Sequence, residues 1–235
     1  MPLDFTPWSF AHALVLACMA LAICLSVRFR ATRRDPARRT QVDRAFGALL
    51  LGLWILINGW YLWPAHFALA RSLPLHICDL VSLWAPLALL TDSRTARSLL
   101  YFWGIALCSQ AYITPTLTEG PALPAFWLFW GAHFIILFGV TYDLWARSFR
   151  PTQADLRLAV IASLFYAACI VPFDMISGTN YGYLGPSQPE QPTLIDYLGP
   201  WPVRVPIMII LGVGMMIIAY LPWRLVQPRT GAAIP

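Results

Sequence analysis

The chain has 235 residues, of which 59% are hydrophobic and only 11% are charged, and its mean hydropathy is +0.63. A soluble domain carries about 25% charged residues, so this composition excludes an ordinary soluble enzyme and requires a surface that faces lipid. At roughly 20 residues a span, the chain has room for six or seven transmembrane helices with short loops. We therefore expect a single integral membrane domain over residues 1–235.

The net charge of +5 does not predict a nucleic-acid partner, because the 16 basic residues are all arginines in short loops between apolar runs. A nucleic-acid site would instead gather them on one solvated surface. Two of the five cysteines, Cys18 and Cys24, lie in the first apolar run, and the others lie within or at the edges of later runs. No disulfide framework is implied.

Seven apolar runs predict an all-α bundle of about seven transmembrane helices. They are Trp8–Val27, Phe46–Trp63, Ile77–Leu90, Leu99–Ile113, Ala125–Trp145, Leu156–Phe173 and Val203–Trp223. The third and fourth runs are shorter than a full span, and the third contains Pro86. These two are expected to be tilted, kinked or partly buried behind the longer helices, as broken segments are when they line a cavity.

The arginines predict the orientation of the bundle. With seven spans, 14 of the 16 arginines fall on the side of the first loop, and only Arg71 and Arg204 fall on the other. Basic residues prefer the cytoplasmic side, so we expect the N-terminus outside and the C-terminus inside. The loop from Ser177 to Pro200 then lies outside, where its length and its Gly, Pro, Tyr and Asn content predict a cap or lid.

Polar side chains at membrane depth are costly and usually turn inward to serve a function. The candidates, all in the predicted outer half of the bundle, are Asn58, His76, Cys78, Asp79, Gln110, His133 and Asp174. His133 lies deepest, roughly 12 Å below the outer end of its helix at 1.5 Å per residue. It needs a partner, which is either a helix-packing hydrogen bond or a functional group.

The segment Leu73–Leu80 places three chemically capable side chains at a helix start. A cysteine in a first turn lies near unpaired backbone N–H groups, which favour a thiolate, and a nearby histidine can take its proton. Cys78 is therefore a candidate nucleophile. The alternative is that Cys78 is a small buried apolar residue and Asp79 a partner of the helix dipole. Cys108 lies between the two interpretations, because Ser109 and Gln110 follow it.

A metal site is the competing chemistry, since histidines with a carboxylate could hold a catalytic zinc ion. The candidate ligands are His12, His66, His76, His133, Asp79 and Asp174. No histidine pair has the i, i+4 spacing of a recognisable zinc motif, so we expect no metal.

Five segments resemble, in chain order, the YwaF-like family of bacterial integral membrane proteins, over about residues 45 to 225. They are Leu73–Asp79, Tyr101–Gly104, the helix around His133, Gly178–Leu184 and Leu198–Pro202. That family is similar to a eukaryotic transmembrane acyltransferase that moves a fatty acyl chain between phospholipids through a catalytic cysteine and histidine. More distantly, that acyltransferase looks like the androgen-induced membrane hydrolases of fatty acid esters of hydroxy fatty acids, which use threonine in place of cysteine.

Matched residue by residue, the resemblance implies Cys78 as the nucleophile and His133 as the base, in a multi-pass protein of a bacterial cytoplasmic membrane. The sequence thus predicts a lipid acyltransferase or acyl-ester hydrolase that works through a thioester, needs no cofactor and has membrane lipids as partners. Further candidate substrate-binding residues are His76, Asp79, Asn58, Gln110, Asn180 and Tyr181. The alternative is a carrier of a lipid or small polar ligand with no covalent step. The oligomeric state stays open.

Overall fold

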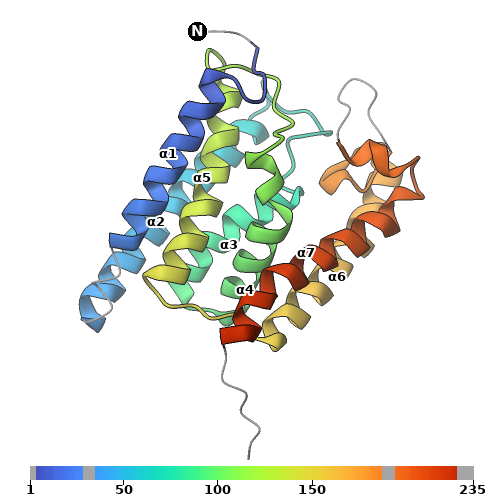
Figure 1. Cartoon of the computed structure of the whole chain (residues 1–235). Helices are drawn as coiled ribbons and strands as arrows, with labels where there is room; N and C mark the ends of the chain where they lie inside the picture. The colour runs from blue at the N-terminus through green and yellow to red at the C-terminus, as the bar shows by residue number, and fades with distance from the viewer. Residues whose placement is uncertain (1–3, 29–34, 187–193, 227–235) are drawn as a thin grey trace, which may run out of the picture.

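The computed structural model describes residues 4–28, 35–186 and 194–226, and in these ranges the chain is all-α (Figure 1). The seven α-helices of the described residues are α1 (Phe10–Arg28), α2 (Pro36–Leu62), α3 (Ile77–Thr91), α4 (Arg94–Phe102), α5 (Pro124–Trp145), α6 (Gln153–Ser177) and α7 (Arg204–Val226). The described residues form no β-strand, only an isolated bridge between Asp4 and Glu119. The predicted all-α helical fold is confirmed.

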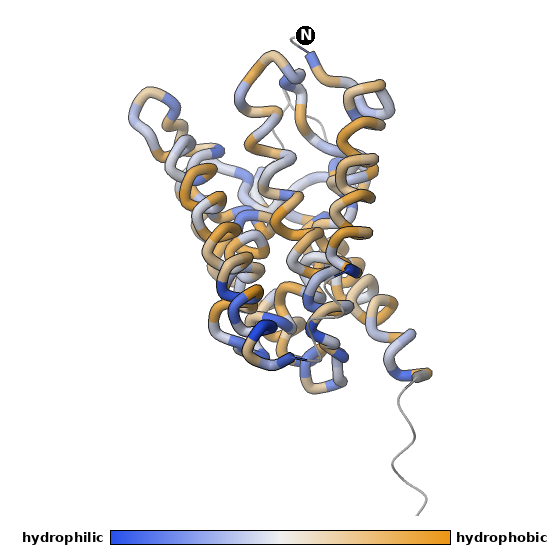
Figure 2. The backbone as a smooth tube through the Cα atoms, turned by 90° about the vertical axis from the view of Figure 1, so that its left-hand side faces the viewer, coloured by the Kyte–Doolittle hydropathy of each residue, from blue (hydrophilic) through white to orange (hydrophobic). Residues whose placement is uncertain are grey.

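Five of these helices, namely α1, α2, α5, α6 and α7, are long and apolar enough to cross a membrane. Figure 2 shows apolar residues along the helices and hydrophilic residues gathered at the end of the bundle opposite the N-terminus. The lipid-facing surface explains why large apolar side chains such as Phe10, Phe165 and Ile176 remain exposed. The chain is a multi-pass membrane protein.

Helix α3 lies inside the bundle, in contact with α2, α4 and α5. Its residues Val81, Ala85 and Ala88 are completely buried. Small residues allow the close approach to α5, since a Cβ on Gly139 would lie 2.6 Å from the Cβ of Ala85. With 15 residues, α3 is too short for an independent span, and the surrounding protein shields it from lipid.

The predicted fourth span, Leu99–Ile113, is not one α-helix. Helix α4 ends at Phe102, and the chain continues as the π-helical turn η2 (Trp103–Leu107) and the 3₁₀ turn η3 (Ser109–Tyr112). The N–H of Cys108 donates to the carbonyl of Trp103, five residues back, at 2.9 Å. Irregular backbone at membrane depth is tolerated where protein surrounds it, and Phe102, Trp103 and Cys108 are buried.

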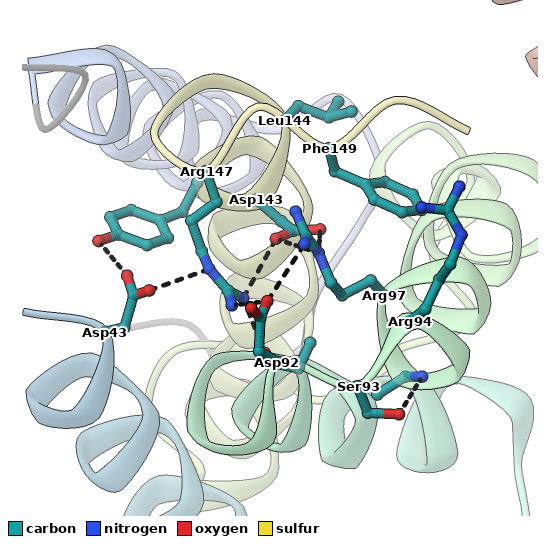
Figure 3. A network of polar contacts seen from close by, with 12 residues as sticks. Asp43, Asp92, Ser93, Arg94, Arg97, Asp143, Leu144, Arg147 and Phe149 are labelled. Carbon is teal, nitrogen blue, oxygen red and sulfur yellow. Dashed lines mark hydrogen bonds and ion pairs between the residues drawn. The ribbon is translucent and has the colours of Figure 1, made fainter. Parts of the chain in front are cut away.

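A buried network of charges ties the helices together at the end opposite the N-terminus (Figure 3). The guanidinium of Arg147, just beyond α5, lies 3.0 Å from Asp43 of α2, 2.5 Å from Asp92 after α3 and 3.2 Å from Asp143 of α5. Arg97 of α4 contacts both Asp92 and Asp143. Three helices therefore meet at one nearly inaccessible arginine, whose side chain is only 1% exposed, and α4 joins them through Arg97.

The loop after α6 is built on a buried carboxylate. Oδ1 of Asp174 accepts hydrogen bonds from the Thr179 hydroxyl at 2.6 Å and from the N–H of Tyr181 at 3.0 Å. The N–H of Gly185 donates to the side chain of Asn180. These bonds fold residues 178–185 back on the end of the helix. The remainder of the predicted cap includes residues 187–193, which lie outside the described residues.

Gly185→Ala is expected to disrupt this loop, because a Cβ there would lie 2.1 Å from the carbonyl oxygen of Thr179 and cannot avoid backbone. Overpacking of this kind costs about 1–3 kcal/mol, so the melting temperature in detergent should fall and protease cleavage near residue 185 should increase. Gly59→Ala is the control, since no other side chain of the described residues lies within 4 Å of a Cβ at Gly59. Equal melting temperatures for the two variants would contradict the packing argument.

The orientation of the bundle stays a prediction. Cysteine-accessibility mapping in intact cells should label an introduced cysteine at Ser9 from outside and one at Ser148 only after permeabilisation, because the arginines favour a cytoplasmic location for the second. Labelling in the opposite order would overturn the orientation. Four of the arginines behind it lie outside the described residues, namely Arg30, Arg33, Arg34 and Arg229.

Candidate active site

A cavity of about 740 Å³ lies between α2, the start of α3, η2, α5, α6 and α7. A volume of this size suits a ligand with a substantial apolar part. Six predicted site residues line it, namely Asn58, His76, Cys78, Asp79, Gln110 and His133. The polar residues that the sequence scatters over four segments thus meet around one space.

Cys78 occupies the second position of α3, and local hydrogen bonding fixes that helix start. His76 has an extended backbone, and its N–H donates to Oδ2 of Asp79 at 3.1 Å. The N–H groups of Ile77 and Cys78 lie in the first turn, where no carbonyl of the helix can accept their hydrogen bonds. The thiol therefore lies at the positive end of a helix and faces the cavity, as the sequence predicts.

His133 reaches the cavity from the middle of α5 and is 4% exposed. Its Nδ1 lies 2.8 Å from the carbonyl oxygen of Phe129. A carbonyl only accepts, so Nδ1 carries the proton and the neutral ring keeps its lone pair on Nε2. Nε2 is buried and makes no well-aligned hydrogen bond to the described residues, although the ring is within interaction range of the Cys78 thiol.

Aromatic packing holds the imidazole in place. The ring of Phe129 lies 4.2 Å from it, and the ring of Tyr112 meets it edge-on at 5.7 Å and 89°. The Tyr112 hydroxyl donates to the backbone carbonyl of His133 at 2.7 Å. The sequence predicts that the His133 side chain needs a partner. Its own helix supplies one for Nδ1, and Nε2 stays available for a reaction.

Cys108 is the cavity residue that the sequence left undecided. It follows η2, is 1% exposed, and its Sγ lies 3.3 Å from Sγ of Cys78. The only sequence signal for it is the polar Ser109 and Gln110 that follow an apolar run. The break in the predicted fourth helix brings this thiol to the start of α3.

His76 connects the outer loop to the helix that carries Cys78. Its Nδ1 accepts a hydrogen bond from the N–H of Gly182 at 3.2 Å, and the Tyr166 hydroxyl donates to the carbonyl of Leu75 at 2.7 Å. Burial lowers the pKa of His76 below the ordinary histidine value, so the ring is neutral at pH 7. A neutral ring suits this accepting role.

The two loop residues among the candidates lie beside the cavity and do not line it. Asn180 accepts the hydrogen bond from Gly185. Tyr181 is buried, and its hydroxyl donates to the carbonyl of Leu69 at 2.5 Å and accepts from the N–H of Leu73 at 3.1 Å. In the structure both side chains hold the backbone of the surrounding loops in place.

The structure does not bring the four histidines together. Both ring nitrogens of His12 are engaged elsewhere, with the N–H of Trp8 at 2.9 Å and the carbonyl of Tyr112 at 3.2 Å. His66 stacks on Trp60 with ring centroids 4.0 Å apart. Within the part of the chain that the structure describes, no three His, Cys, Asp or Glu side chains form a group that could hold a metal ion.

Comparison with known proteins identifies the family of the chain. The model of the TMEM164 family matches residues 5–220, a range that contains the whole cavity lining. The chain belongs to the TMEM164 family. No curated protein and no solved structure matches the chain. In this TMEM164 family protein, the matched range includes α1 to α6 and most of α7. It therefore includes the buried segments that carry Cys78, Cys108 and His133.

Proposed function

We propose that this protein is a membrane-embedded lipid acyltransferase or acyl-ester hydrolase that works through Cys78 and His133. The observation that carries the proposal is the meeting of two groups in one cavity: a cysteine in the first turn of a helix and a buried histidine whose Nε2 has no aligned partner among the described residues. The YwaF-like resemblance, which implies the same two residues, supports it. Membrane lipids are the proposed partners, and a bacterial cytoplasmic membrane is the proposed location.

In the first half of the reaction, Nε2 of His133 takes the proton from Sγ of Cys78, and the thiolate attacks the carbonyl carbon of an acyl ester. The C–O bond then breaks, and the leaving alkoxide takes the proton back from the imidazolium. The product is a thioester on Cys78 and a free hydroxyl compound. The Nδ1–H bond to Phe129 fixes the ring tautomer that this step needs.

In the second half, His133 removes a proton from an acceptor hydroxyl or from water, and the resulting oxygen attacks the thioester carbonyl. The Cys78 thiolate leaves and recovers its proton from the imidazolium. The unpaired N–H groups at the start of α3, with Asn58 or Gln110, are proposed to stabilise the oxyanion in both halves. His76 and Asp79 are proposed to hold the start of α3 in place and to contact the head group.

The cavity lining supports a substrate with one polar end and one apolar end. The side of the cavity towards α7 contributes Met208, Met215 and Met216, and methionine side chains adapt to flexible chains. The lining also includes Arg71 and Tyr183, whose side chains can contact a head group. An acyl lipid combines these two chemistries in one molecule.

The test is to reconstitute the protein in liposomes with a panel of phospholipids and other acyl esters and to follow the products by mass spectrometry. Exchange of acyl chains indicates a transferase, and release of free fatty acid indicates a hydrolase. Trapping the acyl group on Cys78 would establish the thioester. Binding of lipid without turnover over the whole panel would instead support the carrier.

A further inference from the structure

Two thiols from distant parts of the chain meet at the cavity. Sγ of Cys78, on α3, and Sγ of Cys108, at the junction of η2 and η3, lie 3.3 Å apart, and both residues line the same space. The contact is a thiol–thiol hydrogen bond between residues 30 positions apart. The mechanism above uses only one of these sulfurs.

The surroundings allow the two sulfurs to move closer. A disulfide requires a separation of about 2.05 Å, so the approach needed is small. Cys108 lies where a π-helical turn passes into a 3₁₀ turn, and this backbone is less regular than an α-helix. Cys78 lies in the first turn of its helix, where fewer backbone hydrogen bonds hold the chain.

We infer that Cys108 is the resolving thiol of Cys78, so that a peroxide converts the pair reversibly to a disulfide and switches the site off. The inference rests on the proposed role of Cys78 as the nucleophile, and it adds a regulator to that site. The neighbouring thiol captures oxidised Cys78 before a further oxygen adds.

The reaction balances with hydrogen peroxide as the oxidant. The Cys78 thiolate attacks one peroxide oxygen, the O–O bond breaks, and the departing hydroxide takes up the thiol proton as water, leaving a sulfenic acid on Cys78. Cys108 then attacks the Cys78 sulfur, the S–O bond breaks, and a second water leaves with the Cys108 proton. Two thiols lose two electrons to the peroxide, and an added dithiol or phosphine reverses the change.

Without Cys108, oxidation of Cys78 leads to a different product. A sulfenic acid with no thiol beside it proceeds to sulfinic and sulfonic acids, which thiol reductants do not reverse. The three other cysteines cannot substitute, because Cys18 and Cys24 on α1 and Cys169 on α6 are exposed on the outside of the bundle and do not line the cavity. Cys108 therefore decides whether oxidative inactivation is reversible.

The experiment uses the full chain in liposomes, in a background where Cys18, Cys24 and Cys169 are replaced by alanine. Hydrogen peroxide should remove the mass of two hydrogens, and peptide mapping should find Cys78 linked to Cys108. A phosphine reductant should restore both free thiols and any acyl transfer. Cys108→Ser, which keeps a hydrogen-bond donor, should instead gain two or three oxygens on Cys78 and stay oxidised after reduction.

Two results would overturn the inference: sulfinic acid on Cys78 as the main product when Cys108 is present, or full reversibility in Cys108→Ser. Cys78→Ser controls for oxidation of Cys108 alone and should form no disulfide. The mass readout does not depend on lipid turnover. If the disulfide forms but no acyl ester is consumed, the proposed function fails while the thiol pair stands; if acyl transfer occurs without the disulfide, only the inference fails.

Discussion

Replacing Cys78 with alanine is expected to abolish acyl transfer, and replacing His133 with alanine should cost nearly as much. The two side chains act on the same proton and the same thiolate, so neither works without the other. We expect each single variant to lose about 10³-fold or more in kcat, and the double variant to lose no more than the worse single one, as coupled catalytic residues do. Mass-spectrometric assay of acyl exchange in liposomes measures all three losses.

The controls separate a lost reaction from a lost fold. Cys169→Ala, on the exposed face of α6, should keep full activity. Melting temperatures of the Cys78 and His133 variants in detergent should stay near that of the wild type, because each change leaves the helix backbone intact. Additive losses would argue against a shared step. Full turnover by Cys78→Ala would refute the nucleophile, and inactivation by a chelator would favour the zinc alternative.

Composition and charge predict most of this fold, because apolar runs mark the segments that face lipid and charged residues mark the segments that face water. Seven apolar runs identify the seven helical regions, and the structure gives an α-helix over six of them, whereas the α-helical part of the fourth ends at Phe102. The boundaries shift where polar residues join a helix. Helix α2 begins at Pro36, ten residues before its apolar run, because Asp35 caps it through the N–H groups of Ala37 and Arg38. Hydropathy alone cannot detect such an extension.

The break after Phe102 could not be predicted in the same way. A π turn differs from an α turn only in which carbonyl accepts a hydrogen bond, here Trp103 for the N–H of Cys108. No proline interrupts either turn, and the polar Ser109 and Gln110 come only after the π turn. Tertiary packing against α7 and α3 therefore decides the backbone, and the sequence pattern carries no sign of it.

Some residues of the candidate site could likewise be predicted from the sequence, and others could not. His133 and Cys78 are detectable because polar or reactive groups stand out in an apolar run. Cys108 is harder to recognise, since a buried cysteine is indistinguishable from a small apolar residue until its neighbour is known. Tyr181 is the opposite case, because the sequence draws attention to a residue that does not line the cavity. It is conspicuous in a polar loop, yet its hydroxyl serves two backbone groups and not the cavity.

The charge network at the end opposite the N-terminus should dominate the stability of the protein. Arg147→Ala leaves the buried carboxylate of Asp43, with 8% of its side chain exposed, without its closest counter-ion, while the buried Asp143 stays paired with Arg97. Breaking a buried ion pair from one side costs about 3–5 kcal/mol. We expect a large fall in the melting temperature in detergent, measured by tryptophan fluorescence.

Two matched variants decide whether the loss comes from uncompensated charge. Arg39→Ala removes a more exposed partner of Asp43, 3.6 Å away and 35% exposed, and exposed helix pairs of this kind contribute only about 0.3–0.5 kcal/mol. Arg147→Met combined with Asp43→Asn removes both charges of the Arg147–Asp43 pair and leaves Asp143 paired with Arg97, so it should recover much of the stability that Arg147→Ala loses. If this double variant is no more stable than Arg147→Ala, the shape of the arginine side chain holds this end of the bundle and its charge does not.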